Sequence, residues 1–245
     1  MAMELLTLSL SVGFMTTFGV MLGLNYGQPS RRALAFYLGL ATGIMSLIIV
    51  MDLLPAAFGQ GPIEAVGIGL GCGLLMMLIL YEGLHRRLHN RPVNVFDQES
   101  NYLRMGLSIC VAMIVHHIPE GIAIGAGYET HHQLGVIIAL SIALHNIPEG
   151  IGMAIPLRMA GMRRRTILLV SLIISSCIPF GAYLGKYLFV QSVFMVSFGM
   201  AFAAGSMGFI VWKELAPVSL KHHRLFALLG MAFSLVLIFL IQILR

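Results

Sequence analysis

Long apolar runs separated by short polar breaks occupy most of the chain. Each run is about as long as the roughly 20 apolar residues that an α-helix needs to cross the hydrocarbon core of a bilayer. Eight such runs can be identified, at residues 4–24, 33–55, 63–84, 105–127, 133–157, 166–188, 190–212 and 225–244. The pattern therefore predicts eight transmembrane helices and an all-α integral membrane protein.

The composition argues against a soluble globular protein and against a nucleic-acid-binding module. Hydrophobic residues make up 58% of the 245 residues and charged residues 10%, whereas about a quarter of an ordinary soluble domain is charged. The net charge of +5 could suggest nucleic acid as a partner, but such binding needs a basic face on a folded module, and the breaks are too short to hold one. We expect one transmembrane domain over residues 1–245, surrounded by lipid. Because the first run lacks the basic segment and cleavage site of a signal peptide, we expect it to be retained.

The basic residues are distributed unevenly between the two sides of the predicted membrane. Of the 15 Lys and Arg residues, only Lys186 and Arg245 fall on one side. The other thirteen lie in the alternate loops, as Arg31, Arg32, Arg86, Arg87, Arg91, Arg104, Arg158, Arg163, Arg164, Arg165, Lys213, Lys221 and Arg224. Cytoplasmic loops carry the excess of Lys and Arg, so both termini are expected to be extracytoplasmic. The compact loops favour a bacterial inner membrane.

Two internal repeats are visible in the sequence. An offset of 162 residues aligns the second run with the seventh, which share the pattern G-x-M-x6-[DE]-L-x-P from Gly43 and from Gly205. The same offset aligns the first run with the sixth and the third with the eighth, and an offset of 29 aligns residues 116–121 with 145–150. Copies five spans apart have opposite polarity in the membrane. We predict a 3+2+3 inverted-repeat arrangement, which recurs in secondary transporters.

Ionisable residues inside the spans are the most informative ones, because each costs about 2.5–3.5 kcal/mol at the centre of a membrane helix. The fourth run contains H-H-I-P-E-G from His116, and the fifth contains H-N-I-P-E-G from His145. A His and a Glu four residues apart share one helix face, so His116 is grouped with Glu120 and His145 with Glu149. Two imidazoles and two carboxylates suit zinc or a neighbouring first-row divalent ion. We therefore predict a metal site between these two spans.

The prolines and glycines of these segments lead to two further expectations. Pro119 and Pro148 lack an N–H, so the carbonyls four residues before them lose their helical partners and are expected to face the site. Gly121 and Gly150 follow the two glutamates and leave room for close helix approach. We expect these glycines to let the two central helices pack tightly against each other.

The paired H-x-x-P-E-G segments on the fourth and fifth of eight spans resemble the ZIP (Zrt/Irt-like) family of divalent metal transporters, and its bacterial branch in particular. The resemblance implies a transporter that moves zinc, and in some members iron, manganese or cadmium, into the cytoplasm. The metal is then the substrate, and no prosthetic group is expected. The resemblance also implies a binuclear centre in which the thioether of Met45 on the second span joins His116, Glu120, His145 and Glu149.

The second metal position of that family departs from its pattern here. The resemblance implies ligands at the residue after each of the two histidines and at a Glu before a Pro on the sixth span. Asn146 matches, whereas His117 stands in place of an Asn and Ile178 in place of the acid. We predict one complete metal position and one weakened position to which His117 and Asn146 contribute.

Other polar residues near the ends of the spans are candidates for metal vestibules. Asp52 and Glu214 occupy equivalent positions of the repeat, and carboxylates at a channel mouth attract cations. Acids at helix ends are equally well explained by simple contact with water. Glu82, His85 and His89, at the end of the third span, are candidates for an exit path or for metal sensing.

Two other functions compete with transport. A membrane-embedded metal-dependent hydrolase would use the ion to activate water, but the chain has no H-E-x-x-H motif, and four symmetric ligands leave no free acid. A metal sensor without transport would need a signalling domain, which no loop is long enough to hold. A carrier with a midplane site is the favoured hypothesis. The metal preference, the coupling ion and the oligomeric state, a homodimer included, stay open.

Overall fold

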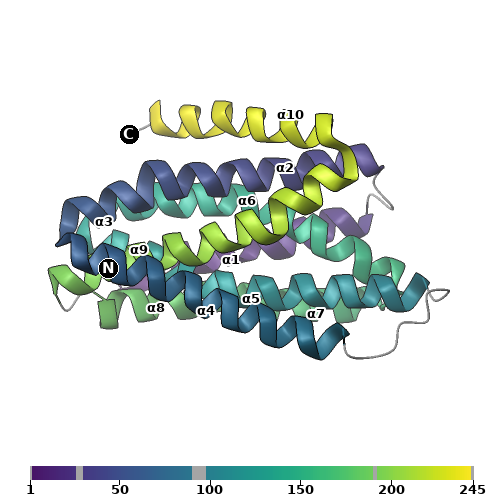
Figure 1. The fold of residues 1–245 in the computed structure, drawn as a ribbon, viewed down its shortest axis with the longest axis horizontal. Coiled ribbons are helices and arrows are strands. Elements are labelled where there is room, and N and C mark those ends of the chain that lie inside the picture. The colour runs from purple at the N-terminus through teal and green to yellow at the C-terminus, as the bar shows by residue number, and fades with distance from the viewer. Residues whose placement is uncertain (1, 26–29, 90–97, 190–191, 244–245) are drawn as a thin grey trace.

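The computed structural model describes residues 2–25, 30–89, 98–189 and 192–243. Every element within these ranges is helical, and eight helices are long and apolar enough to cross a membrane. Figure 1 shows them side by side, with the beginning of the first helix and the end of the last at the left of the view. The prediction of an all-α protein with eight membrane-length helices is confirmed.

Several of the eight spans are built from more than one helical element. The elements in chain order are α1 (Ala2–Asn25), α2 (Arg31–Ile48), η1 (Ile49–Leu53), α3 (Leu54–Gln60), α4 (Ile63–His89), α5 (Gln98–Thr130), α6 (His132–Met159), α7 (Arg164–Ser175), α8 (Cys177–Leu184), η2 (Gly185–Phe189), α9 (Val193–Ile210), η3 (Val211–Leu215) and α10 (Ala216–Ile243). The η elements are π-helical turns inside longer helices.

Two of the π-helical turns end two residues before a proline. Pro55 follows η1 and Pro217 follows η3. Proline lacks the N–H that would bond the carbonyl four residues earlier, and a π turn is a local change in helical hydrogen bonding that accommodates such a gap. The second span consequently continues through Pro55 to Gln60, five residues beyond its predicted end.

Corresponding elements begin and end at positions 162 residues apart. Residues 31–48 form α2 and residues 193–210 form α9, and the turns η1 and η3 follow them at the same spacing. The helix is then interrupted in both copies at equivalent residues with extended backbone. These are Gly61 at the end of α3, with φ −161°, and His223 within α10, with φ −166°. The repeat read from the sequence therefore coincides with repeated local structure.

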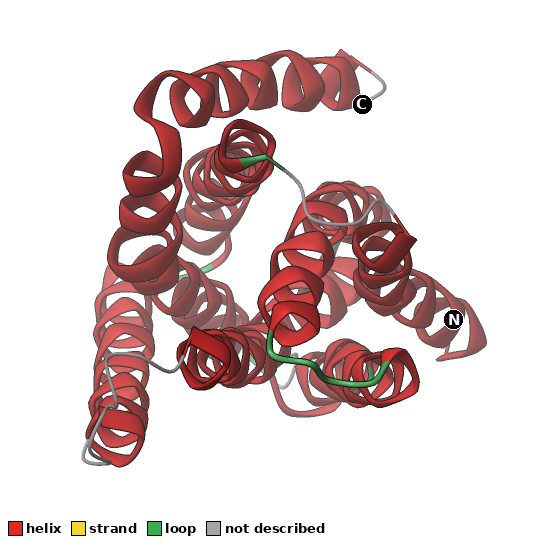
Figure 2. Ribbon diagram, turned by 90° about the vertical axis from the view of Figure 1, so that its right-hand side faces the viewer, coloured by secondary structure: helices red, strands yellow, loops and turns green. Residues whose placement is uncertain are grey.

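The helices pack in matching pairs around α5 and α6. These two helices pack against each other, α1 packs against α6, and α8 packs against α5. On the outside, α2 packs against α10 and α4 against α9. Figure 2 shows the helices in a view along the bundle. Within the molecule 72% of the α5 and α6 spans is buried, against 22% of the α10 span. The two central helices are thus the best shielded from lipid.

The glycines that follow the central glutamates pack against the flanking helices. A Cβ atom on Gly121 would lie 2.2 Å from the carbonyl oxygen of Ile178 in α8, and one on Gly150 would lie 2.2 Å from that of Thr16 in α1. The prediction that these glycines pack α5 against α6 is wrong, because both face the neighbouring helix on the outer side. They determine how closely α8 packs against α5 and α1 against α6.

Candidate metal centre

The central helices supply four buried polar side chains at one level of the bundle. Helix α5 carries His116 and Glu120, and helix α6 carries His145 and Glu149. Both helices continue through the proline that precedes the Glu. None of the four residues is more than 4% exposed. Since ionisable groups buried in a membrane bundle are costly without compensation, this group is the leading candidate for a functional site.

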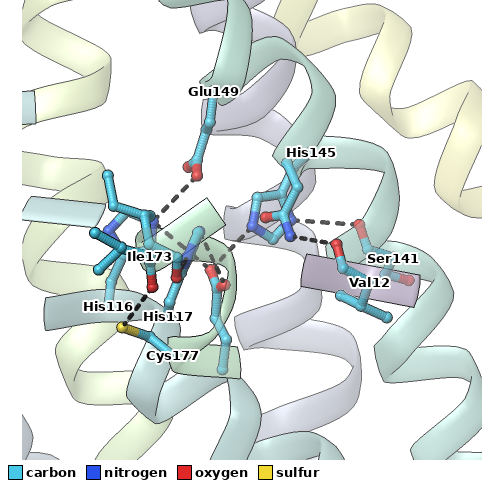
Figure 3. A network of polar contacts seen from close by, with 11 residues as sticks. Val12, His116, His117, Ser141, His145, Glu149, Ile173 and Cys177 are labelled. Carbon is cyan, nitrogen blue, oxygen red and sulfur yellow. Dashed lines mark hydrogen bonds and ion pairs between the residues drawn. The ribbon is translucent and has the colours of Figure 1, made fainter. Parts of the chain in front are cut away.

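The four side chains form two hydrogen-bonded pairs that cross from one helix to the other (Figure 3). His116 Nε2 lies 3.1 Å from Glu149 Oε2, and His145 Nε2 lies 2.9 Å from Glu120 Oε1. The pairs are joined, because His116 Nε2 and Glu120 Oε1 are 4.0 Å apart. The structure therefore brings together all four residues that the sequence pattern grouped.

A fifth side chain, that of His117, completes the group. His117 is fully buried, and its Nδ1 lies 3.1 Å from the backbone carbonyl oxygen of Ile174 in α7. Its Nε2 lies 4.0 Å from Glu120 Oε2. His117 thus stands between the metal-site candidates and the sixth span.

Several polar atoms of this group have no hydrogen-bond partner among the described residues. They are Glu120 Oε2, Glu149 Oε1 and His117 Nε2. A buried acceptor without a donor costs free energy that a bound cation would recover. Ligand atoms of His116, His117 and Glu120 all lie within 4.8 Å of one another. Imidazole and carboxylate together suit zinc and its first-row neighbours, so the group can hold a divalent ion.

The remaining members of the predicted second metal position lie differently. Asn146 is fully buried, and its Nδ2 donates a hydrogen bond of 3.1 Å to the carbonyl oxygen of Val12 in α1. Ile178 lies in an apolar cluster and offers no ligand atom. Among the residues at the predicted second metal position, His117 is the one that the structure brings to the central group.

The other predicted site residues lie elsewhere in the bundle. Met45 is fully buried in α2 within the apolar cluster, and its role as a ligand stays a prediction. Asp52 is buried inside η1, and Glu82 is exposed near the end of α4. Vestibule roles for these acids also stay predictions. Three further candidates have side chains outside the described part of the structure, namely His85, His89 and Glu214.

A cavity of about 220 Å³ reaches His116 and Glu149 from one end of the bundle. We call this the basic end: it is the end at which α1 stops and α2 begins, on the right in Figure 1. The cavity is lined by Leu34 near the start of α2, by Tyr81 in the last turns of α4 and by Lys213 in η3. The candidate metal centre is therefore connected to the basic end.

Apolar packing fills the bundle on the other side of the centre. An apolar cluster combines the later part of α2 and η1, the last turns of α5 and the first turns of α6. Its large fully buried members include Ile44, Met45, Ile48, Ile124, Ile138 and Ile142. Cavities of about 250 and 310 Å³ at this opposite end are lined by residues outside the central group. In this conformation the centre is closed toward the opposite end.

The backbone carbonyls that hydrogen-bond the site residues are other ones than those predicted four residues before Pro119 and Pro148. Besides the carbonyls of Ile174 and Val12, that of Ser141 lies 3.3 Å from His145 Nδ1. A carbonyl carries no signal in residue identity. The nearest sequence signal is Pro179 on the sixth span, which marks the helix break after α7.

Eight membrane-length helices around a buried group of imidazoles and carboxylates define a class: a multi-pass membrane protein built around a candidate divalent-metal centre. Comparison with known families narrows it. The sequence model of the ZIP Zinc transporter family matches residues 82–242, and this chain belongs to that family.

Curated relatives agree with the family. Zinc transporter ZupT of Salmonella heidelberg (strain SL476) is 38% identical over 125 residues, which are 48% of this chain and 48% of the relative. The ZupT proteins of Salmonella newport (strain SL254) and Salmonella typhimurium (strain LT2) match with the same identity and coverage. The chain thus spans about half the length of the curated relatives it matches.

Proposed function

We propose that this protein takes up divalent metal, zinc foremost, into the cytoplasm through the His/Glu centre of α5 and α6. The observation that carries the proposal is the buried group of reciprocal pairs, His116 with Glu149 and Glu120 with His145. Its donor set matches zinc, and family membership points to the same cargo. Iron, manganese and cadmium are secondary candidates. The transported ion is substrate, so no prosthetic group is required.

The proposal includes a 3+2+3 inverted arrangement in the membrane. Three features support it: element boundaries 162 residues apart, equivalent π turns, and matching helix pairs on the two sides of α5 and α6. The charge asymmetry of the loops supports a cytoplasmic basic end and extracytoplasmic termini, although Arg91 and Arg245 lie outside the described residues. A bacterial inner membrane suits this topology.

With that orientation, the cavity that reaches His116 and Glu149 faces the cytoplasm. The apolar cluster then closes the centre toward the outside. The conformation is the one from which a carrier releases its ion inward, and transport requires a second conformation in which the closure and the opening are exchanged. An incoming ion must also displace the protons that the His/Glu pairs hold.

The test is zinc uptake by proteoliposomes that contain the purified protein. The wild type should accumulate zinc, whereas His145→Ala and Glu149→Ala should reduce uptake to the level of empty liposomes because each removes a ligand of the central group. The matched control is His131→Ala, which alters an exposed histidine at the N-terminus of α6. Thermal unfolding of the metal-free variants checks that they are folded.

Full uptake by the folded His145→Ala and Glu149→Ala variants would refute the assignment of the site. The second candidate function, a membrane-embedded metal-dependent hydrolase, would instead need a metal with an open position for water. The family is one of transporters, and the symmetric donor set argues against an open position. Uptake without any hydrolytic turnover therefore remains the expected behaviour.

A further inference from the structure

We propose that His117 is a ligand of the transported ion and that the centre holds one dication per chain, surrounded by three imidazoles and two carboxylates. The inference rests on the proposed function and specifies its coordination. It departs from the binuclear centre that the family resemblance implied. The five donors are His116, His117, Glu120, His145 and Glu149.

The hydrogen bonding of His117 selects the ring nitrogen that faces the ion. The Ile174 carbonyl, 3.1 Å from His117 Nδ1, can only accept, so the ring proton sits on Nδ1. Nε2 is then left with its lone pair, 4.0 Å from Glu120 Oε2. Two acceptors face each other, and neither has a hydrogen-bond partner among the described residues. A cation between them satisfies both.

The separations are close to those of a bound ion. Zinc bonds of about 2.0–2.2 Å place neighbouring ligand atoms of a five-coordinate ion roughly 3–3.6 Å apart. The ligand atoms of His116, His117 and Glu120 already lie within 4.8 Å of one another. The proposal requires side-chain rotations that bring these three ligand atoms, and those of His145 and Glu149, closer to one ion.

The Ile174 carbonyl is available because the sixth span is interrupted. Helix α7 ends at Ser175, and α8 begins at Cys177, two residues before Pro179. Carbonyls in the last turn of a helix lack the regular partner four residues later, and that of Ile174 accepts the Nδ1–H of His117 beside the N–H of the cap residue Ser176. Metal-bound histidines commonly donate their second ring nitrogen to a carbonyl in this way, which fixes the ring and raises its basicity.

Charge balance sets the number of ions at one. Glu120 and Glu149 together carry two negative charges, which neutralise one dication, while a second dication would leave two positive charges buried without a counter-charge. Such charges in a low-dielectric interior are very costly. The other buried acid among the described residues, Asp52, lies in η1, which packs chiefly against α2, α3 and α9. Ile178 stands where the family resemblance implies a Glu, so the carboxylate that a second ion would need is missing at this position.

Asn146 has a structural role in this arrangement. Its amide nitrogen Nδ2 donates a hydrogen bond to the Val12 carbonyl of α1, whereas its buried Oδ1 has no hydrogen-bond partner among the described residues. A neutral amide oxygen adds no negative charge, so Asn146 cannot offset a second buried dication, and we assign His117 to the first position.

A third imidazole also affects selectivity. Imidazole favours zinc, cobalt and nickel, whereas manganese and magnesium prefer oxygen ligands. His117 therefore acts as a specificity-determining residue that biases the centre toward zinc over manganese.

The test combines metal stoichiometry with zinc X-ray absorption on purified full-length protein. The wild type should bind one zinc per chain with three imidazoles. His117→Gln, which can still bond the Ile174 carbonyl, should bind one zinc with two imidazoles, weaken zinc affinity by about 10- to 100-fold and narrow the preference for zinc over manganese in competition. His117→Phe, which fills the same space without a donor atom, should show the same imidazole count.

Two controls separate the possible outcomes. Asn146→Ala and His131→Gln should keep one zinc and three imidazoles. Two zinc ions per wild-type chain, or an imidazole count that His117→Gln leaves unchanged, would overturn the inference while leaving metal transport through His145 and Glu149 intact. A wild-type protein that neither binds nor accumulates zinc would instead overturn the proposed function.

Discussion

The imidazoles of His116 and His145 each lie against the carboxylate of the other central helix. The cross-helix distances of 3.1 and 2.9 Å are shorter than the 4.0 Å between His116 and Glu120 on α5. Sharing of partners between helices means that a change in one residue disturbs both halves of the centre. Individual residues of the group should therefore tolerate substitution poorly even when size and shape are kept.

Glu149→Gln tests the charge of the centre without changing its shape. The amide can still form a hydrogen bond with His116, so the metal-free protein should fold. The bound dication would face one carboxylate instead of two, and uncompensated buried charge costs several kcal/mol, which corresponds to a loss of zinc affinity of about 100-fold or more. Zinc titration of the purified protein measures this loss, and an affinity within threefold of the wild type would contradict the charge argument.

Residue spacing predicted which face of each helix carries the centre, but not the partner of each side chain. The i, i+4 spacing placed His145 and Glu149 together, whereas the shortest contacts run to α5. The rotation of α5 relative to α6 decides those contacts, and spacing within one helix carries no information about it. The same holds for Asn146, whose amide nitrogen bonds the Val12 carbonyl, a contact that spacing did not predict; its role at a metal stays a prediction.

At the scale of helices, glycine contacts hold α1 to α6 and α8 to α5 in equivalent ways. A Cβ atom on Gly19 would approach the Ile147 carbonyl oxygen to 2.1 Å, and one on Gly181 would approach that of Ile118 to 2.2 Å. Gly181 lies 162 residues after Gly19, and Ile147 lies 29 residues after Ile118. The two glycine contacts are therefore related to each other by both repeat offsets. They hold α1 and α8 at the level of the candidate metal centre.

Gly150→Ala should destabilise the protein although alanine is the better helix former. The new Cβ would meet the Thr16 carbonyl oxygen at 2.2 Å, and overpacking of this kind costs about 1–3 kcal/mol. Gly71→Ala is the matched control on α4, because nothing lies within 4 Å of its added Cβ. Thermal unfolding in detergent should show a lower midpoint for Gly150→Ala and an equal or higher one for Gly71→Ala; equal midpoints for both variants would count against the contact.

Hydropathy located the eight spans because burial in lipid demands a run of apolar residues whatever the neighbours are. Which helices pack together depends on which helix faces carry small residues. Hydropathy does not reveal these faces, because lipid-facing and helix-facing residues are both apolar here. Gly121 illustrates this limit: its small size was correctly identified as a packing feature, but its contact is with α8. The π turns before Pro55 and Pro217 also lie beyond what periodicity can show.

For the whole molecule, the open and closed ends of the centre determine which side a solute can reach it from. The cavity from the basic end contacts His116 and Glu149, and apolar side chains pack the opposite half. The charge of the loops predicted which side each loop lies on, but the sequence could not show which side of the centre is open, because one sequence would support both states of the carrier that we propose.

Cysteine labelling tests this asymmetry. In a variant whose three native cysteines are replaced by alanine, Ala112→Cys on the cavity wall should react with a membrane-impermeant thiol reagent applied from the basic end, and zinc should slow the reaction. Ile138→Cys, buried in the apolar cluster, should stay unlabelled from that end. Labelling of residue 138 together with protection of residue 112 would mean that the open side is misassigned.

The crossed His/Glu bridges also determine how firmly cargo is held. Four of the ligand atoms are hydrogen-bonded to one another across α5 and α6, so an arriving ion must replace two intramolecular hydrogen bonds. We therefore expect the centre to bind zinc more weakly than the same ligands would without these competing bonds. After the ion leaves, re-formation of the two His/Glu hydrogen bonds would compete with rebinding of the same ion. The centre would thereby return to its metal-free arrangement before the next transport cycle.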